Sequence, residues 1–208
     1  MNPILHCFSS GIDSTSVLLE LSTRAQPVYL LRVNLRRGNR WRAEEPAGDA
    51  ILAWLAARRE WSPARVLHGE WKSPTNSLSD VEVVALFCGD ALRAFPDIAD
   101  IAVSTSLTDR QDSSWEARHR SRVDFTQRIA GRTLAWTTPN WELTRREVIE
   151  SLPEDVRSLC VFCRMPVGPG LAPCGTCGSC RATLPWLARP GPRTSALAAS
   201  WRRREYAR

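Results

Sequence analysis

Apolar and polar residues alternate along this chain between two kinds of segment. Short apolar runs, which are typical of buried strands, are separated by longer stretches in which apolar residues recur every three or four positions, as on one face of a helix. The predicted strands are residues 4–8, 28–33, 64–68, 98–104 and 133–137. The predicted helices are a segment around 17–21 and residues 44–61, 80–95 and 115–129.

Strands that alternate with helices in this way indicate βαβ units. We therefore expect an α/β fold in which a parallel sheet carries helices on both faces. Ligands of such sheets bind beyond the carboxyl ends of the strands. This places three loops on one rim, at residues 9–14, 104–115 and 137–141, and the spacing of Thr144 and Glu147 predicts a capping box that begins a further helix.

The character of the chain changes after Pro153, where cysteine, glycine and proline replace the helical pattern. A chain of 208 residues is long enough for one domain and a small module. We expect an α/β domain at residues 1–152, a four-cysteine helical and loop module at 153–190, and a basic tail at 191–208.

Composition favours a globular protein, with 43% apolar and 24% charged residues. No apolar run approaches the length of about 18 residues that a membrane helix needs, and no leader pattern precedes the first strand. We therefore expect a cytoplasmic protein with reduced thiols. The net charge of +6 is carried almost entirely by arginine and suits anionic nucleotides, although nucleic acid is also compatible with it.

The most distinctive motif is the run Ser9-Ser10-Gly11-Ile12-Asp13-Ser14 between the first strand and the first helix. Amides of such a loop and the helix N-terminus point at one spot, and the helix dipole favours negative charge there. Small side chains let the backbone approach a phosphate. The run lacks the lysine of a Walker A motif, so it is not an ordinary P-loop.

Five of the seven cysteines lie close together in the sequence, at Cys160, Cys163, Cys174, Cys177 and Cys180. Cys-x2-Cys spacing lets two thiolates bind one metal ion, and four thiolates make a tetrahedral structural zinc site. An iron–sulfur cluster is the less favoured alternative. Two ligand sets fit the spacing: Cys160 and Cys163 with the first two downstream cysteines, or Cys163 with all three.

The Ser9–Ser14 run resembles the Ser-Gly-Gly-x-Asp-Ser signature of the PP-loop ATP pyrophosphatase superfamily, from which it departs at Ser10. These enzymes cleave ATP between the α and β phosphates and adenylate an oxygen of the substrate. The resemblance implies that Ser9, Ser10, Gly11, Ile12, Asp13 and Ser14 hold ATP. Asp13 would position Mg²⁺, and Asp13 and Ser14 would take part in catalysis.

Together with Cys174-Gly175-Thr176-Cys177-Gly178-Ser179-Cys180-Arg181, the loop resembles the 7-cyano-7-deazaguanine (preQ0) synthase family over residues 3–185. The family's fold is Rossmann-like, of the adenine nucleotide α hydrolase type. The resemblance favours zinc ligation by Cys163, Cys174, Cys177 and Cys180. Arg145 stands where the family's Pro-x-x-Leu-Thr-Lys-x-Glu segment has lysine, and it is a candidate for pairing with a phosphate or a carboxylate.

The resemblance implies an ATP-dependent carbon–nitrogen ligase acting on 7-carboxy-7-deazaguanine and ammonia. Segments 34–40, 73–77 and 109–115 depart from the family pattern, so we expect a divergent member that could use a related acid or a protein amine, as in anti-phage defence or deazapurine DNA modification. Asp112, Ser114 and Trp115 are the candidate substrate-binding residues, and Trp115 could either stack on a base or fill the core. We further expect a homodimer.

Two other functions compete with the ligase. A PP-loop tRNA-modifying enzyme would need a sulfur-accepting cysteine, and Cys7 and Cys88 lie in apolar patterns that suggest buried thiols. A non-enzymatic zinc ribbon could bind nucleic acid through its arginines, but it would leave the Ser9–Ser14 run unexplained.

Overall fold

The computed structural model describes residues 1–36, 38–72, 79–110 and 113–187. The fold is α/β, and its five strands form one sheet in the order β3-β2-β1-β4-β5 with all neighbours parallel. The strands are β1 (Ile4–Cys7), β2 (Val28–Leu35), β3 (Arg65–Trp71), β4 (Asp100–Ala102) and β5 (Ala135–Thr137). The helices are α1 (Ile12–Leu21), α2 (Arg40–Arg59), α3 (Asp80–Ala94), α4 (Leu107–Arg110), α5 (Trp115–Ala130), α6 (Arg145–Ser151), α7 (Glu154–Leu159) and α8 (Gly178–Leu187).

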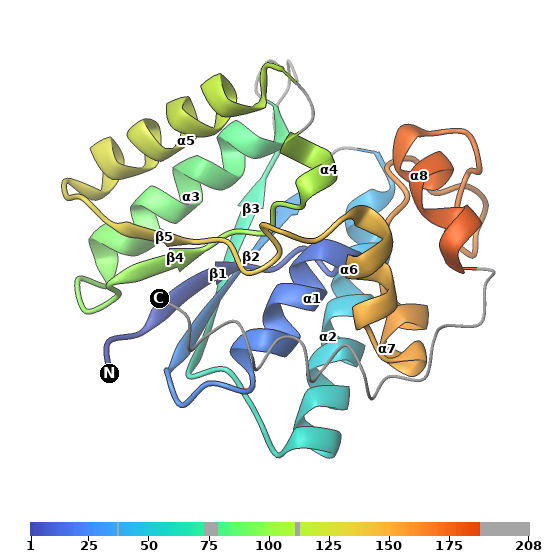
Figure 1. Cartoon of the computed structure of the whole chain (residues 1–208), viewed down its shortest axis with the longest axis horizontal. Coiled ribbons are helices and arrows are strands. Elements are labelled where there is room, and N and C mark those ends of the chain that lie inside the picture. The colour runs from blue at the N-terminus through green and yellow to red at the C-terminus, as the bar shows by residue number, and fades with distance from the viewer. Residues whose placement is uncertain (37, 73–78, 111–112, 188–208) are drawn as a thin grey trace.

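Helices cover both faces of the sheet, as the alternating pattern predicts (Figure 1). Helices α3 and α5 lie on one face, where Leu92 and Ala130 pack with Leu5 and Ile101 of the sheet. Helices α1, α2, α6 and α7 lie on the other face, where they form a larger core with Ile4 and other sheet residues. Successive side chains of β1 point to opposite faces, so this short strand contributes to both cores.

Every strand predicted from the pattern is present, but the bounds differ. Strand β3 runs on to Trp71, beyond the predicted end at His68, and β4 is confined to Asp100–Ala102 within the predicted 98–104. Helix α2 begins at Arg40, four residues before the predicted start at Glu44. The buried residues of α2 begin only at Gly48, and Pro46 lies inside the helix, so neither the apolar spacing nor the proline marks its true start.

The predicted module at 153–190 contains two helices: α7 packs on the larger core through Val156, and α8, which carries Cys180, packs against α6 (Figure 1). Cysteines of this module form a small buried cluster with Phe162, which also packs on the larger core. The predicted basic tail at 191–208 lies outside the described residues. Among the helices of the described part, none is long and apolar enough to cross a membrane.

Candidate functional site

The Ser9–Ser14 run forms the turn between β1 and α1, at the carboxyl edge of the sheet. Gly11 is the N-cap of α1, and no side chain caps this helix start. The Ser14 hydroxyl closes the loop on itself, since it donates to the Gly11 carbonyl at 3.1 Å and accepts from the Ser9 amide at 3.3 Å. The geometry is thus the strand, small-residue loop and uncapped helix start that an anion site requires.

Ser10 adopts a left-handed backbone conformation, with φ of 58°. Residues with a Cβ seldom occupy this region, and glycine enters it at little cost. The Ser10 side chain compensates by donating from Oγ to the Glu44 carbonyl at 2.7 Å. Gly48 on α2 leaves the room for that side chain, because a Cβ there would lie 2.8 Å from Ser10 Oγ.

The loops that follow β1, β4 and β5 meet at one edge, as predicted. The Leu107 amide donates to the Leu143 carbonyl at 2.7 Å, and the Arg145 amide donates to Thr108 Oγ1 at 3.0 Å. Asn140, which is fully buried, donates from Nδ2 to the Asp13 carbonyl at 3.2 Å. These bonds tie the rim together around the start of α1.

Asp13 and Arg145, two of the predicted site residues, form an ion pair from opposite sides of the rim. Arg145 Nη1 donates to Asp13 Oδ2, and Arg145 Nη2 donates to Thr183 Oγ1 of α8 at 3.2 Å. The Arg145 side chain keeps only 19% of its surface exposed, and the Asp13 side chain keeps 26%. Asp13 Oδ1 is buried and has no hydrogen-bond partner among the described residues, so one oxygen of this carboxylate is left for a ligand.

The three predicted substrate-binding residues differ in where they lie and in how far they are buried. Asp112 lies outside the described residues. Ser114 is exposed and accepts from Arg118 Nη1 at the start of α5. Trp115 is only 9% exposed, its ring lies parallel to His119 at 4.7 Å, and the ring of Trp141 meets it edge-on at 5.4 Å.

An aromatic and arginine cluster therefore occupies the rim beside β5. Two of its members, Arg110 and Trp141, were not predicted as site residues from the sequence. The guanidinium of Arg110 lies 3.9 Å from the centre of the Trp141 ring and donates to the Trp141 carbonyl at 2.8 Å. Both residues fall in loops already assigned to the rim. Their position in loops after strands was the only sequence signal for a place at the rim. The stacking of the Arg110 guanidinium on the Trp141 ring is visible only in the fold.

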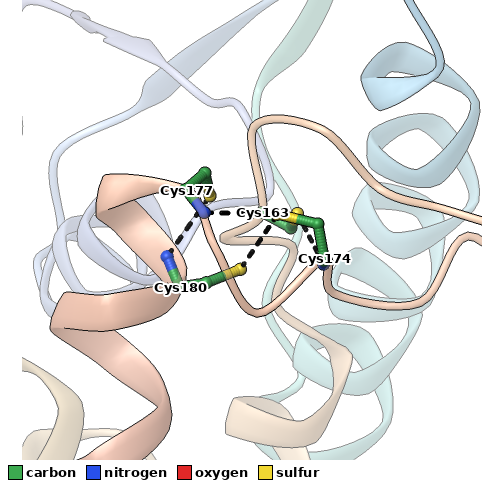
Figure 2. Close-up of side chains that lie close together, drawn as sticks. All are labelled: Cys163, Cys174, Cys177 and Cys180. Atoms are coloured by element: carbon green, nitrogen blue, oxygen red, sulfur yellow. Dashed lines mark hydrogen bonds between the residues drawn. The ribbon is translucent and has the colours of Figure 1, made fainter.

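Four cysteines come together in the C-terminal module, and Figure 2 shows their side chains converging. The sulfur atoms of Cys163, Cys174, Cys177 and Cys180 all lie within 4.8 Å of one another. The turn at Gly175, with φ of 74°, lets the Cys177 amide donate to Cys174 Sγ at 3.4 Å. The Cys174 amide donates to Cys163 Sγ at 3.2 Å. This cluster could bind a zinc ion.

Two of these thiols differ in acidity. The Thr176 hydroxyl and the amide of Cys177 stabilise the thiolate of Cys174 and lower its pKa to about 6. Burial and the neighbouring Cys177 thiol raise the pKa of Cys180 to about 12. A metal ion would displace the remaining protons, so metal binding should release protons and weaken as the pH falls.

Cys160 is not part of this cluster. It is buried in the larger core, where its thiol contacts the Val156 carbonyl at 3.5 Å, and burial raises its pKa to about 11. Of the two ligand sets left open by the spacing, the structure brings together the one without Cys160. Cys7 and Cys88 lie elsewhere, with their sulfur atoms 2.9 Å apart.

In comparisons with known proteins, no protein-family model matches this chain, and no curated protein matches it significantly. Function is therefore inferred from the geometry and chemistry of the site itself.

Proposed function

We propose that this chain is an ATP-dependent carbon–nitrogen ligase that adenylates a carboxylic acid, with a Rossmann-like fold of the adenine nucleotide α hydrolase type. The observation that carries the proposal is the Ser9–Ser14 loop at the carboxyl edge of a parallel sheet, with the Asp13 carboxylate and the Arg145 guanidinium beside it. The acid proposed is 7-carboxy-7-deazaguanine or a close relative, which the motif resemblance suggests.

Phosphates would lie at the start of α1, where uncapped amides and the helix dipole favour anions. Arg145 is placed to take a phosphate or carboxylate oxygen, since its Nε is buried without a partner among the described residues. Its planar fork suits such groups better than a lysine would.

A magnesium ion fits the free oxygen of Asp13. Mg²⁺ prefers carboxylate and phosphate oxygens, and Asp13 Oδ1 is an unpartnered carboxylate oxygen beside the proposed phosphate site. When bound, the ion would neutralise phosphate charge. Asp13 would then bind Mg²⁺ through Oδ1 while Oδ2 keeps Arg145 in place.

The reaction needs no protein nucleophile. The carboxylate oxygen of the acid attacks the α-phosphorus of ATP, and the bond to the bridging oxygen breaks as pyrophosphate leaves with the electron pair. Ammonia or another amine then attacks the acyl carbon, loses a proton to water and expels AMP. The loop amides and Arg145 act by positioning and by stabilising developing charge.

The four-cysteine cluster would hold a structural zinc. Four thiolate ligands leave no open position for a water molecule, so zinc would take no part in the chemistry. A site of reduced thiols also favours the cytoplasm as the location.

The substrate is tested by adding 7-carboxy-7-deazaguanine to the protein with ATP, Mg²⁺ and an ammonium salt. We expect the acid to stimulate pyrophosphate release, and mass spectrometry should show an amide, a nitrile or a conjugate. The matched control is 7-deazaguanine, which lacks the carboxylate and should give no stimulation. Adenylation without an amide or a nitrile would indicate a different acceptor, whereas ATP binding without adenylation would show that the acid is wrong.

A further inference from the structure

The four-cysteine module contacts the proposed phosphate loop directly. The Val161 amide donates to the Ser10 carbonyl at 2.9 Å. The Val161 carbonyl lies so close to Gly11 that a Cβ there would be 3.5 Å from it. Val161 precedes Cys163, one of the clustered cysteines, by two residues. The chain that enters the cysteine cluster therefore lies against the loop at its left-handed residue, Ser10.

A second contact from the module reaches the charged pair of the site. Thr183 follows Cys180 by one turn of α8, and it is completely buried. Its hydroxyl accepts from Arg145 Nη2 at 3.2 Å, while Arg145 Nη1 pairs with Asp13. The two NH₂ groups of the Arg145 guanidinium are thus held from different sides, one by Asp13 of α1 and one by Thr183 of α8.

Both contacts lie next to the cysteine cluster, which links the chain carrying Val161 to the helix carrying Thr183, in addition to the packing of α8 against α6 and of Phe162 on the larger core. The two residues are separated by a long loop, and the cysteine cluster joins its two ends. In small metal modules the free energy of metal binding becomes free energy of folding. An unfolded module would release the Ser10 carbonyl and one side of Arg145.

We propose that the cysteine module positions the nucleotide site, with Thr183 as a positioning residue that orients Arg145 against Asp13. The inference rests on the proposed ATP site. Coupling between two binding sites is reciprocal, so if the metal-bound module favours nucleotide binding, the nucleotide must favour metal binding by the same factor. ATP should then tighten the binding of metal to the cysteines.

The experiment measures how much zinc the full chain releases at equilibrium to a competing chromophoric chelator, with and without saturating Mg²⁺–ATP, and ATP binding is measured separately by calorimetry. Thr183→Val keeps the shape of the side chain and removes its hydroxyl, whereas Thr183→Ser keeps the hydroxyl. Thr126→Val is the matched control, since Thr126 is also buried but donates to Ala85 on the far face of the sheet.

We expect ATP to raise the zinc affinity of the wild type about tenfold, within the usual range of coupling. Thr183→Ser and Thr126→Val should keep this effect, and Thr183→Val should lose most of it. ATP binding without any change in zinc release would overturn the inference and leave the proposed function standing. Failure of the wild type to bind ATP would overturn both. If Thr183→Val does not fold, the wild-type comparison still decides whether the coupling exists.

Discussion

Asp13 is the residue on which the proposed chemistry depends most directly. It pairs with Arg145 through one oxygen and leaves the other unpartnered among the described residues. Asp13→Asn should reduce ATP turnover at least about 100-fold, because one oxygen with negative charge is lost at a metal–phosphate site. The fold should survive, since the pair is partly exposed. Turnover assays measure the loss of activity, and thermal unfolding measures whether the fold survives. An active Asp13→Asn protein would contradict the role proposed for Asp13.

His6 makes a pH-dependent contribution to stability. It is fully buried, and its two ring nitrogens face the Ala102 carbonyl at 3.1 Å and the Ser14 carbonyl at 2.9 Å. Burial lowers its pKa below the usual value of 6.5, although the two carbonyls oppose this shift. Below pH 6.5 the unfolded chain therefore binds a proton that the native chain does not.

The contribution of His6 should thus be fully present above pH 6.5 and fall as the pH drops toward the lowered native pKa. One proton limits the slope to about 1.4 kcal/mol per pH unit. Urea unfolding of the wild type and His6→Gln between neutral and mildly acid pH measures the difference, since glutamine can donate to the Ser14 carbonyl but does not titrate. Equal slopes in the two proteins would contradict this origin.

At the scale of elements, the pair α3 and α5 depends on a close approach at Gly89. A Cβ at Gly89 would lie 2.6 Å from Ile129 Cβ and 3.0 Å from the Thr126 carbonyl. Gly89→Ala should therefore lower the free energy of unfolding by about 1–3 kcal/mol, despite alanine's better helix propensity. Gly170→Ala, which meets nothing within 4 Å, is the control and should change it by less than about 0.5 kcal/mol.

The cysteine module should contain about one zinc per chain. Cys163→Ser should lose most of this metal and unfold the module, because it removes one of the four clustered sulfurs. Cys160→Ala is the matched control, and it should keep the metal while losing some core packing. Metal analysis decides between them, and loss of zinc from the Cys160 variant alone would show that the ligand set is wrong.

Element type could be predicted from apolar spacing wherever an element was long enough to show a period. Helices α4 and α7 were not predicted, because four and six residues are too few for a helical pattern. The capping box at Thr144 and Glu147 is confirmed, since both of its hydrogen bonds form. It succeeded because a cap depends on neighbours in sequence and not on the fold.

At the scale of the whole molecule, the site could be predicted only as far as topology dictates it. The convergence of three loops on one rim follows from parallel strands. The proximity of Asp13 and Arg145 could therefore be predicted from the sequence. The contacts of Val161 and Thr183 were not, because they depend on how the cysteine module packs against α6 and the loop. The burial of Trp115 against His119 and Trp141 depends in the same way on the packing of α5.

The central claim is that this chain cleaves ATP between its α and β phosphates to activate a carboxylate. Phosphorus NMR of ATP incubated with the protein, Mg²⁺, 7-carboxy-7-deazaguanine and ammonium is the decisive measurement, with Asp13→Asn as the inactive control. We expect AMP and pyrophosphate to appear together in the wild-type sample and not in the control. Formation of ADP and inorganic phosphate, or ATP left intact by a protein that binds it, would contradict the account.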